Sequence, residues 1–101
     1  MPMEFGFFMR GQFPAEMDMQ ETFAEACEQA RVADELGYSY ILKGQHYSTA
    51  PMQALQLVPF LSRIMVEAPN AKLVPGIVLL PLHKPLDIAE QLASIDIMSG
   101  G

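Results

Sequence analysis

The sequence is poor in the features that mark disulfide-stabilised, nucleic-acid-binding and membrane-surface proteins. Its single cysteine, Cys27, cannot form an internal disulfide, which suits a reducing compartment. Six basic residues against twelve acidic ones leave a formal net charge of −6. The basic residues are scattered singly, so they form no stripe that would displace counterions from nucleic acid. The same charge balance argues against an anionic membrane surface.

Long hydrophobic runs and export signals are also missing. The longest apolar runs, such as residues 77–80, are far shorter than the ~20 residues that a membrane span needs. An acidic residue, Glu4, precedes the first apolar stretch, and no basic leader comes before it, which argues against a signal peptide. We therefore expect a cytoplasmic protein that binds neither nucleic acid nor membranes.

Three short apolar runs predict buried β-strands. They cover residues 4–9, 38–42 and 73–80, and their lengths and their aromatic or branched side chains favour strands over helices. Their starts are spaced by roughly 35 residues, the length of one strand followed by one helix. This spacing indicates parallel strands joined by crossover helices.

Helical signals fill the intervals between these runs. Asp18 opens the first helix with a capping pattern, and Gly37 closes it. A second helix is predicted over residues 52–66, with a kink or a late start at Pro59, which cannot donate a backbone hydrogen bond. A third helix follows Pro85 and ends at a Gly-Gly pair.

The predicted fold class is therefore α/β. A parallel sheet needs both faces covered or closure into a barrel, and a barrel of eight units takes roughly 250 residues. We expect residues 1–101 to be the first three β/α units of a (β/α)8 TIM barrel, an incomplete domain of a longer parent protein. Alone, this piece would expose apolar surface and strand edges, so we expect it to associate and to be inactive.

In β/α folds, functional residues gather on the loops after the strands. The loop at residues 43–51 is the richest here, because His46 lies among amide and hydroxyl side chains. A histidine can donate a proton or bind a cofactor near neutral pH. The alternative is a solvated loop histidine. His83, before the third helix, fits ordinary turn chemistry or an anion site.

The remaining motifs are few. Gly76 lies within the predicted third strand, where a glycine marks either a packing kink or the close approach of a ligand. Cys27 is on the apolar face of the first predicted helix and is expected in the core. The sequence has no HExxH or CxxC pair, no nucleophile elbow and no glycine-rich phosphate loop, so we predict no metal site.

Three motifs in order resemble the luciferase-like monooxygenase family, the flavin-dependent group that includes bacterial luciferase. Residues 34–38 (DELGY) leading into 44–47 (GQHY) resemble a helix end and the active-site loop after the second strand. Residues 76–85 resemble the third strand and its turn. Residues 95–101 (IDIMSGG) resemble the "LD-x-x-SGG" helix end. The resemblance covers this chain from residue 4 onward, but only the first third of such a protein.

The resemblance implies a parent that binds reduced FMN, or in some relatives a deazaflavin, and passes one oxygen atom of O₂ to an organic substrate. His46 is then the catalytic candidate. Phe8 and Gln45 would contact the cofactor, and Gly76-Ile77 matches the position of a non-proline cis peptide under the flavin ring in family members. Gln45 replaces an acidic residue or a first histidine of the family pattern. The phosphate-binding residues of the family lie beyond residue 101.

Two other functions remain open. A deazaflavin-dependent oxidoreductase that transfers hydride shares this part of the barrel. A non-catalytic subunit of a luciferase-like pair is the other alternative, and the exchange at Gln45 favours it. The partners implied are a small-molecule substrate, O₂, a flavin reductase and further subunits in a homo- or hetero-oligomer.

Overall fold

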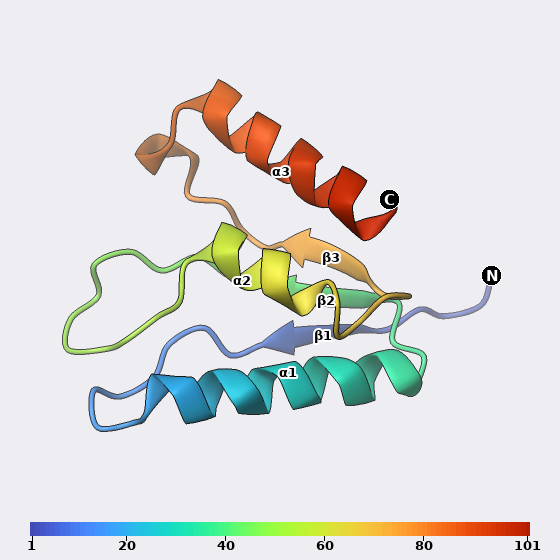
Figure 1. Cartoon of the computed structure of the whole chain (residues 1–101), viewed down its shortest axis with the longest axis horizontal. Helices are drawn as coiled ribbons and strands as arrows, with labels where there is room; N and C mark the ends of the chain where they lie inside the picture. Colours follow the sequence, from blue (N-terminus) through green and yellow to red (C-terminus); the bar gives the residue numbers. More distant parts are fainter.

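Strands and helices alternate along the chain, and a computed structural model describes all residues, 1–101 (Figure 1). The elements are β1 (Gly6–Met9), α1 (Met19–Glu35), β2 (Tyr40–Lys43), α2 (Leu57–Ile64), β3 (Lys72–Pro75), a short 3₁₀ turn (Leu80–Leu82) and α3 (Pro85–Ser99).

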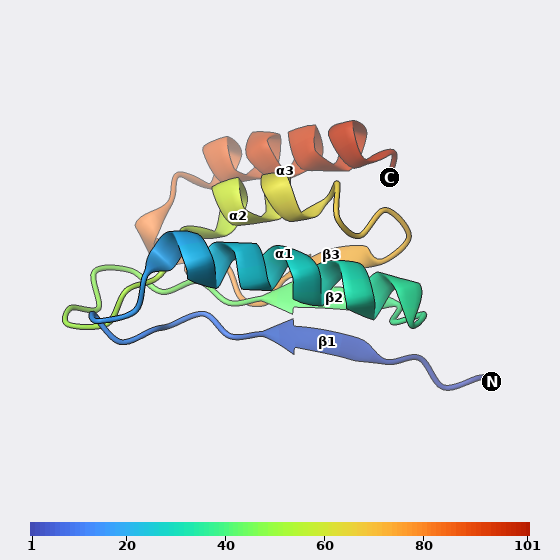
Figure 2. The same cartoon turned by 60° about the horizontal axis from the view of Figure 1, so that its bottom comes forward.

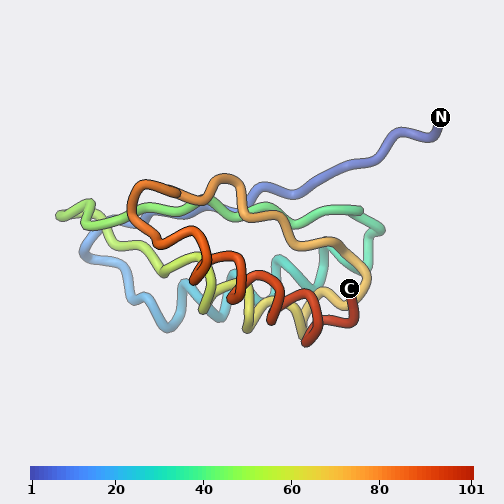
Figure 3. Tube along the Cα trace, turned by 90° about the horizontal axis from the view of Figure 1, so that it is seen from above, coloured from blue at the N-terminus to red at the C-terminus, as the bar shows by residue number.

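The three strands form one parallel sheet in the order β1-β2-β3. Ile41, in the middle of β2, pairs with Phe7 on one side and Leu73 on the other. All three helices lie over the same face of this sheet, and the opposite face is bare (Figures 2 and 3). The predicted α/β fold with parallel strands and crossover helices is therefore confirmed.

The hydrophobic core lies between the sheet and the helices. Met9 and Ile41 reach it from the strands. Apolar side chains meet them from the helices and the α2–β3 loop: Ala30, Ala33, Leu57, Phe60, Leu61, Ile64, Ala68 and Ile95. Cys27 packs against this cluster, as expected, and burial raises the pKa of its thiol.

None of the helices is long and apolar enough to cross a bilayer.

Local signals placed α1 correctly. Asp18 Oδ1 accepts hydrogen bonds from the backbone N–H groups of Gln20 (2.7 Å) and Glu21 (3.1 Å), which caps the first turn. The helix ends at Glu35, and Gly37 takes a left-handed conformation (φ 84°) that glycine adopts without strain. The predicted helix boundaries are confirmed to within about two residues.

Two predicted boundaries were wrong. The second helix begins at Leu57 rather than at residue 52, because the backbone of Gln53 pairs with that of Phe13 (2.9 and 2.7 Å) instead of continuing a helix. Pro59 thus falls in the first turn, where its missing N–H costs nothing, so the predicted late start is confirmed. The third strand ends at Pro75 rather than at residue 80, because its partner β2 ends at Lys43, opposite Pro75. Beyond the strand, the N–H of Leu79 bonds to the side chain of Gln45.

Asp34 fastens the end of α1 to the loop before β3. Its Oδ1 accepts hydrogen bonds from the backbone N–H groups of Asn70 (3.0 Å) and Ala71 (2.7 Å), and Oδ2 accepts one from the Asn70 amide (2.9 Å). Hydrogen bonds to a charged group stabilise more than neutral ones. This single carboxylate therefore joins the end of α1 to the two residues that precede β3.

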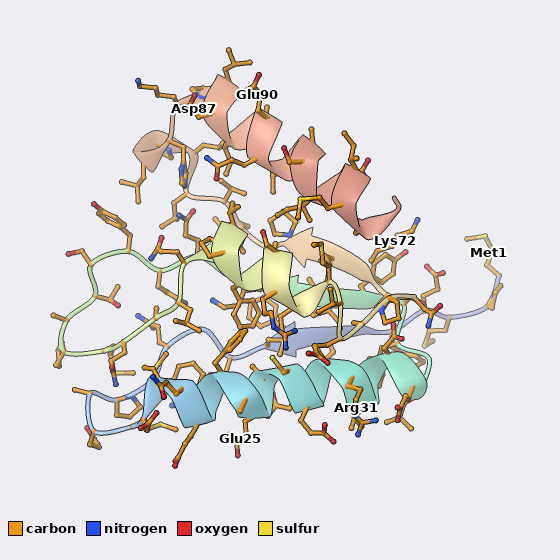
Figure 4. All side chains as sticks on the ribbon, in the orientation of Figure 1. Met1, Glu25, Arg31, Lys72, Asp87 and Glu90 are labelled. Carbon is orange, nitrogen blue, oxygen red and sulfur yellow. The ribbon has the colours of Figure 1, made fainter.

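We expect Asp34→Ala to lower the free energy of unfolding of the complete protein by about 1–3 kcal/mol, because three hydrogen bonds lose their acceptor. Glu25→Ala is the matched control, since Glu25 lies on the same helix and points away from the sheet (Figure 4). Urea unfolding would measure both variants. Equal midpoints for the two would show that Asp34 contributes no more than a surface carboxylate.

Candidate active site at the carboxyl ends of the strands

The carboxyl ends of β1, β2 and β3 meet at one edge of the sheet, on the left of Figure 1. The loops that follow them gather at this edge, as expected for parallel strands. All five residues predicted for the site, Phe8, Gln45, His46, Gly76 and Ile77, lie at the ends of these strands or in these loops.

Residues from all three strand ends lie around Gly44. A methyl group added to Gly44 would lie 3.4 Å from the carbonyl oxygen of Gly76, 3.7 Å from Cζ of Phe8 and 4.0 Å from Nε2 of His46. Three of the predicted site residues, one from each strand end, are therefore brought together around a glycine. The absence of a side chain at Gly44 leaves backbone at the centre of the group.

The surface beside Gly44 is apolar and open. Phe8 is 61% exposed and Ile77 is 68% exposed, although both are large hydrophobic residues. The Gly76–Ile77 peptide bond is cis, at the position that the family resemblance indicated. Exposed aromatic and aliphatic side chains next to glycine backbone suit a flat, largely apolar ligand.

His46 is half-buried, and the structure constrains it from two directions. The Gln56 amide donates a hydrogen bond to the His46 carbonyl oxygen (3.0 Å), which holds its backbone. Its ring lies against Gly11, where an added methyl group would meet the ring carbon Cδ2 at 2.9 Å. His46 thus has an anchored backbone and an imidazole that lies against Gly11 and beside Gly44, a position from which it can exchange a proton with a ligand there.

Gln45 is buried and bonds to other parts of the protein, so its side chain does not face the open surface beside Gly44. Its side chain is buried, with 7% of the residue exposed, and Oε1 accepts a hydrogen bond from the Leu79 backbone N–H (2.8 Å). Its amide nitrogen lies 2.9 Å from Nε2 of His83. Gln45 therefore ties the loop after β2 to the loop after β3, and His83 is a partner in that tie.

Lys43 is the functional-site neighbour that sequence reasoning missed. The residue is 1% exposed, and its ammonium donates hydrogen bonds to the carbonyl oxygens of Gly44 (2.9 Å) and Leu55 (3.5 Å). It also lies 5.1 Å from the centre of the Phe60 ring, within reach of a cation–π interaction. Burial lowers the pKa of Lys43. The two-residue period from Ile41 could have placed Lys43 on the buried face.

Comparison with known proteins agrees with this architecture. A structure of a type II Baeyer–Villiger monooxygenase, the oxygenating constituent of 3,6-diketocamphane monooxygenase from Pseudomonas putida in complex with FMN, matches with a TM-score of 0.84 at 19% identity. The match covers 97% of this chain and 27% of that one. At this identity the likeness shows the fold alone.

A second structure, monooxygenase RslO1 from Streptomyces bottropensis, matches with a TM-score of 0.77 at 30% identity, over 96% of this chain and 30% of that one. The chain thus spans less than a third of the length of either neighbour. No curated protein matches its sequence. The model of one family, described as luciferase-like monooxygenase, matches residues 3–101. With that match over nearly its whole length, the chain belongs to the luciferase-like monooxygenase family.

Proposed function

We propose that this chain is the amino-terminal part of a flavin-dependent monooxygenase built on a (β/α)8 barrel. The observation that carries the proposal is the convergence of Phe8, His46 and Gly76 on Gly44 at the carboxyl edge of the sheet. Family membership supports the reaction class, and the neighbour whose structure contains FMN supports the cofactor. The protein would be cytoplasmic.

The residues at this edge fit a flavin ring. Gly44 and Gly76 offer backbone where a side chain would fill the space, and Phe8 and Ile77 offer exposed apolar surface beside it. When bound, a reduced flavin supplies the electrons that activate O₂ for transfer of one oxygen atom to an organic substrate. Phe8, Gly76 and Ile77 would hold the ring and exclude water from its surface.

His46 would exchange a proton with the bound ligands through its ring, which faces the same point as Phe8 and Gly76. Gln45 would act on the site through the loop that begins at Gly76, because its amide holds the Leu79 N–H. Lys43 would fix the Gly44 carbonyl from the helix side. The remaining partners would be a flavin reductase and further subunits.

The test is a comparison of cofactors in the complete protein. We expect reduced FMN with O₂ to support oxygenation of an organic substrate, and FMN binding to perturb the flavin absorption spectrum. Binding of a deazaflavin with hydride transfer and no oxygen uptake would support the oxidoreductase alternative. Activity that appears only after co-expression with a homologous chain would support the non-catalytic subunit. The isolated 101 residues should neither bind flavin tightly nor turn over.

A further inference from the structure

Gly11 follows β1 and is buried against the candidate catalytic histidine. A methyl group added there would meet two atoms of the His46 ring, Cδ2 at 2.9 Å and Nε2 at 3.1 Å. Carbon atoms in contact normally lie about 3.5–4.0 Å apart, so there is no room for even the smallest side chain. The main chain of Gly11 is therefore one wall of the space that holds the imidazole.

Lys43 also lies beside the space that a side chain at Gly11 would fill. The same added methyl group would lie 3.4 Å from Nζ of Lys43, whose ammonium is buried and hydrogen-bonded to the Gly44 carbonyl. Moving Lys43 away would cost that hydrogen bond inside the protein. Extra volume at Gly11 must therefore displace the His46 ring instead.

Hydrogen bonds hold the backbone on both sides of this contact, near Gly11 and at His46. After Gly11, Phe13 pairs with Gln53 through two backbone hydrogen bonds, and the Gln53 amide donates to the carbonyl oxygens of Pro14 (2.9 Å) and Met17 (3.0 Å). On the other side, Gln56 holds the His46 carbonyl oxygen. The contact thus lies between two anchored segments, and the ring is its one movable part.

We infer that Gly11 is a positioning residue that sets where the His46 imidazole lies. The inference rests on the proposed role of His46. The effect of a substitution at Gly11 comes from the volume of the added side chain and not from backbone conformation. The glycines with positive φ are Gly37, Gly100 and Gly101, and Gly11 is not one of them. Alanine can adopt the backbone at Gly11, so its methyl group is the one change that Gly11→Ala introduces.

The first test follows the ring itself, in the flavin-free complete protein. We expect Gly11→Ala to shift the ¹H and ¹⁵N ring resonances of His46, and Ala15→Val, which adds bulk to an exposed position of the same loop, to leave them unchanged. We also expect Gly11→Ala to lower kcat roughly tenfold, since small displacements of a reacting group slow catalysis. The dissociation constant of the flavin should change little.

The second test is a double-mutant cycle on thermal stability, which needs no activity. We expect Gly11→Ala to lower the melting temperature of the protein, and to lower it much less in a His46→Ala background, where the ring no longer occupies the space. Additive effects together with unmoved ring resonances would overturn the inference. Full turnover in His46→Ala would instead remove the proposed role of His46, and the cycle would still show whether the contact exists.

Discussion

Replacement of His46 by alanine is expected to lower kcat of the complete protein by about 10²-fold or more, the range that general acid–base residues contribute. The ring lies beside Gly44, where Phe8 and Gly76 also converge, so its loss removes the one titratable side chain of that group. The measurement is steady-state turnover with reduced flavin and O₂. Far-UV circular dichroism and the flavin dissociation constant should stay close to those of the unmodified protein.

His46→Gln separates proton transfer from hydrogen bonding. Glutamine keeps a polar group near the position of the ring but cannot carry the proton of an imidazolium. If His46 exchanges a proton, His46→Gln should be nearly as slow as His46→Ala and the pH dependence of kcat should lose one ionisation. Restoration of most of the rate by glutamine would assign His46 a hydrogen-bonding role. Unchanged rates in both variants would remove it from catalysis.

Gly44→Val should reduce flavin affinity by about 100-fold or more. The added side chain would begin 3.4 Å from the Gly76 carbonyl oxygen and 3.7 Å from the Phe8 ring, so it would stand in the middle of the apolar surface. Steric exclusion of a rigid ring leaves no alternative pose with the same contacts. Fluorescence titration with FMN measures the effect.

Ala50→Val is the matched control for this substitution, because it adds two carbons to an exposed position of the same loop. We expect the control to bind flavin as the unmodified protein does. Unfolding curves for both variants would exclude a general loss of structure. Undiminished FMN binding by a folded Gly44→Val protein would place the flavin away from the edge where the three strands end.

The parts of the fold that could be predicted from the sequence are those specified by nearby residues. Asp18 and Gly37 bound α1 through contacts within a few positions of the helix ends, and the short apolar runs identify β1 and β2. The end of β3 was missed because it depends on where its partner strand β2 ends, at Lys43, far earlier in the chain. The start of α2 was missed because Gln53 pairs with Phe13.

The candidate site divides in the same way. His46 has a side chain whose chemistry is visible in the sequence, and Gly76 stands out as a glycine within a predicted strand. The family resemblance pointed to Phe8. Gly11 and Gly44 have no side chain whose chemistry could be recognised in the sequence. Their importance comes from the neighbouring atoms that lie close to where a side chain would be. The sequence predicts Lys43 as a loop residue. In the structure it is the last residue of β2, and the alternation of side chains along the strand places it on the buried face.

The strand order described for the sheet also bears on how the chain is made. Within residues 1–101 each strand pairs with the one that precedes it in the sequence, so none of these pairings must wait for a segment synthesised much later. A ribosome adds about 5–20 residues per second, slow enough for β1 and β2 to pair around α1 before β3 emerges. Growth from the amino terminus would then add one β/α unit at a time to a finished edge. The bare face of the sheet would stay exposed throughout this stage of synthesis, which makes it the surface that a chaperone would meet first.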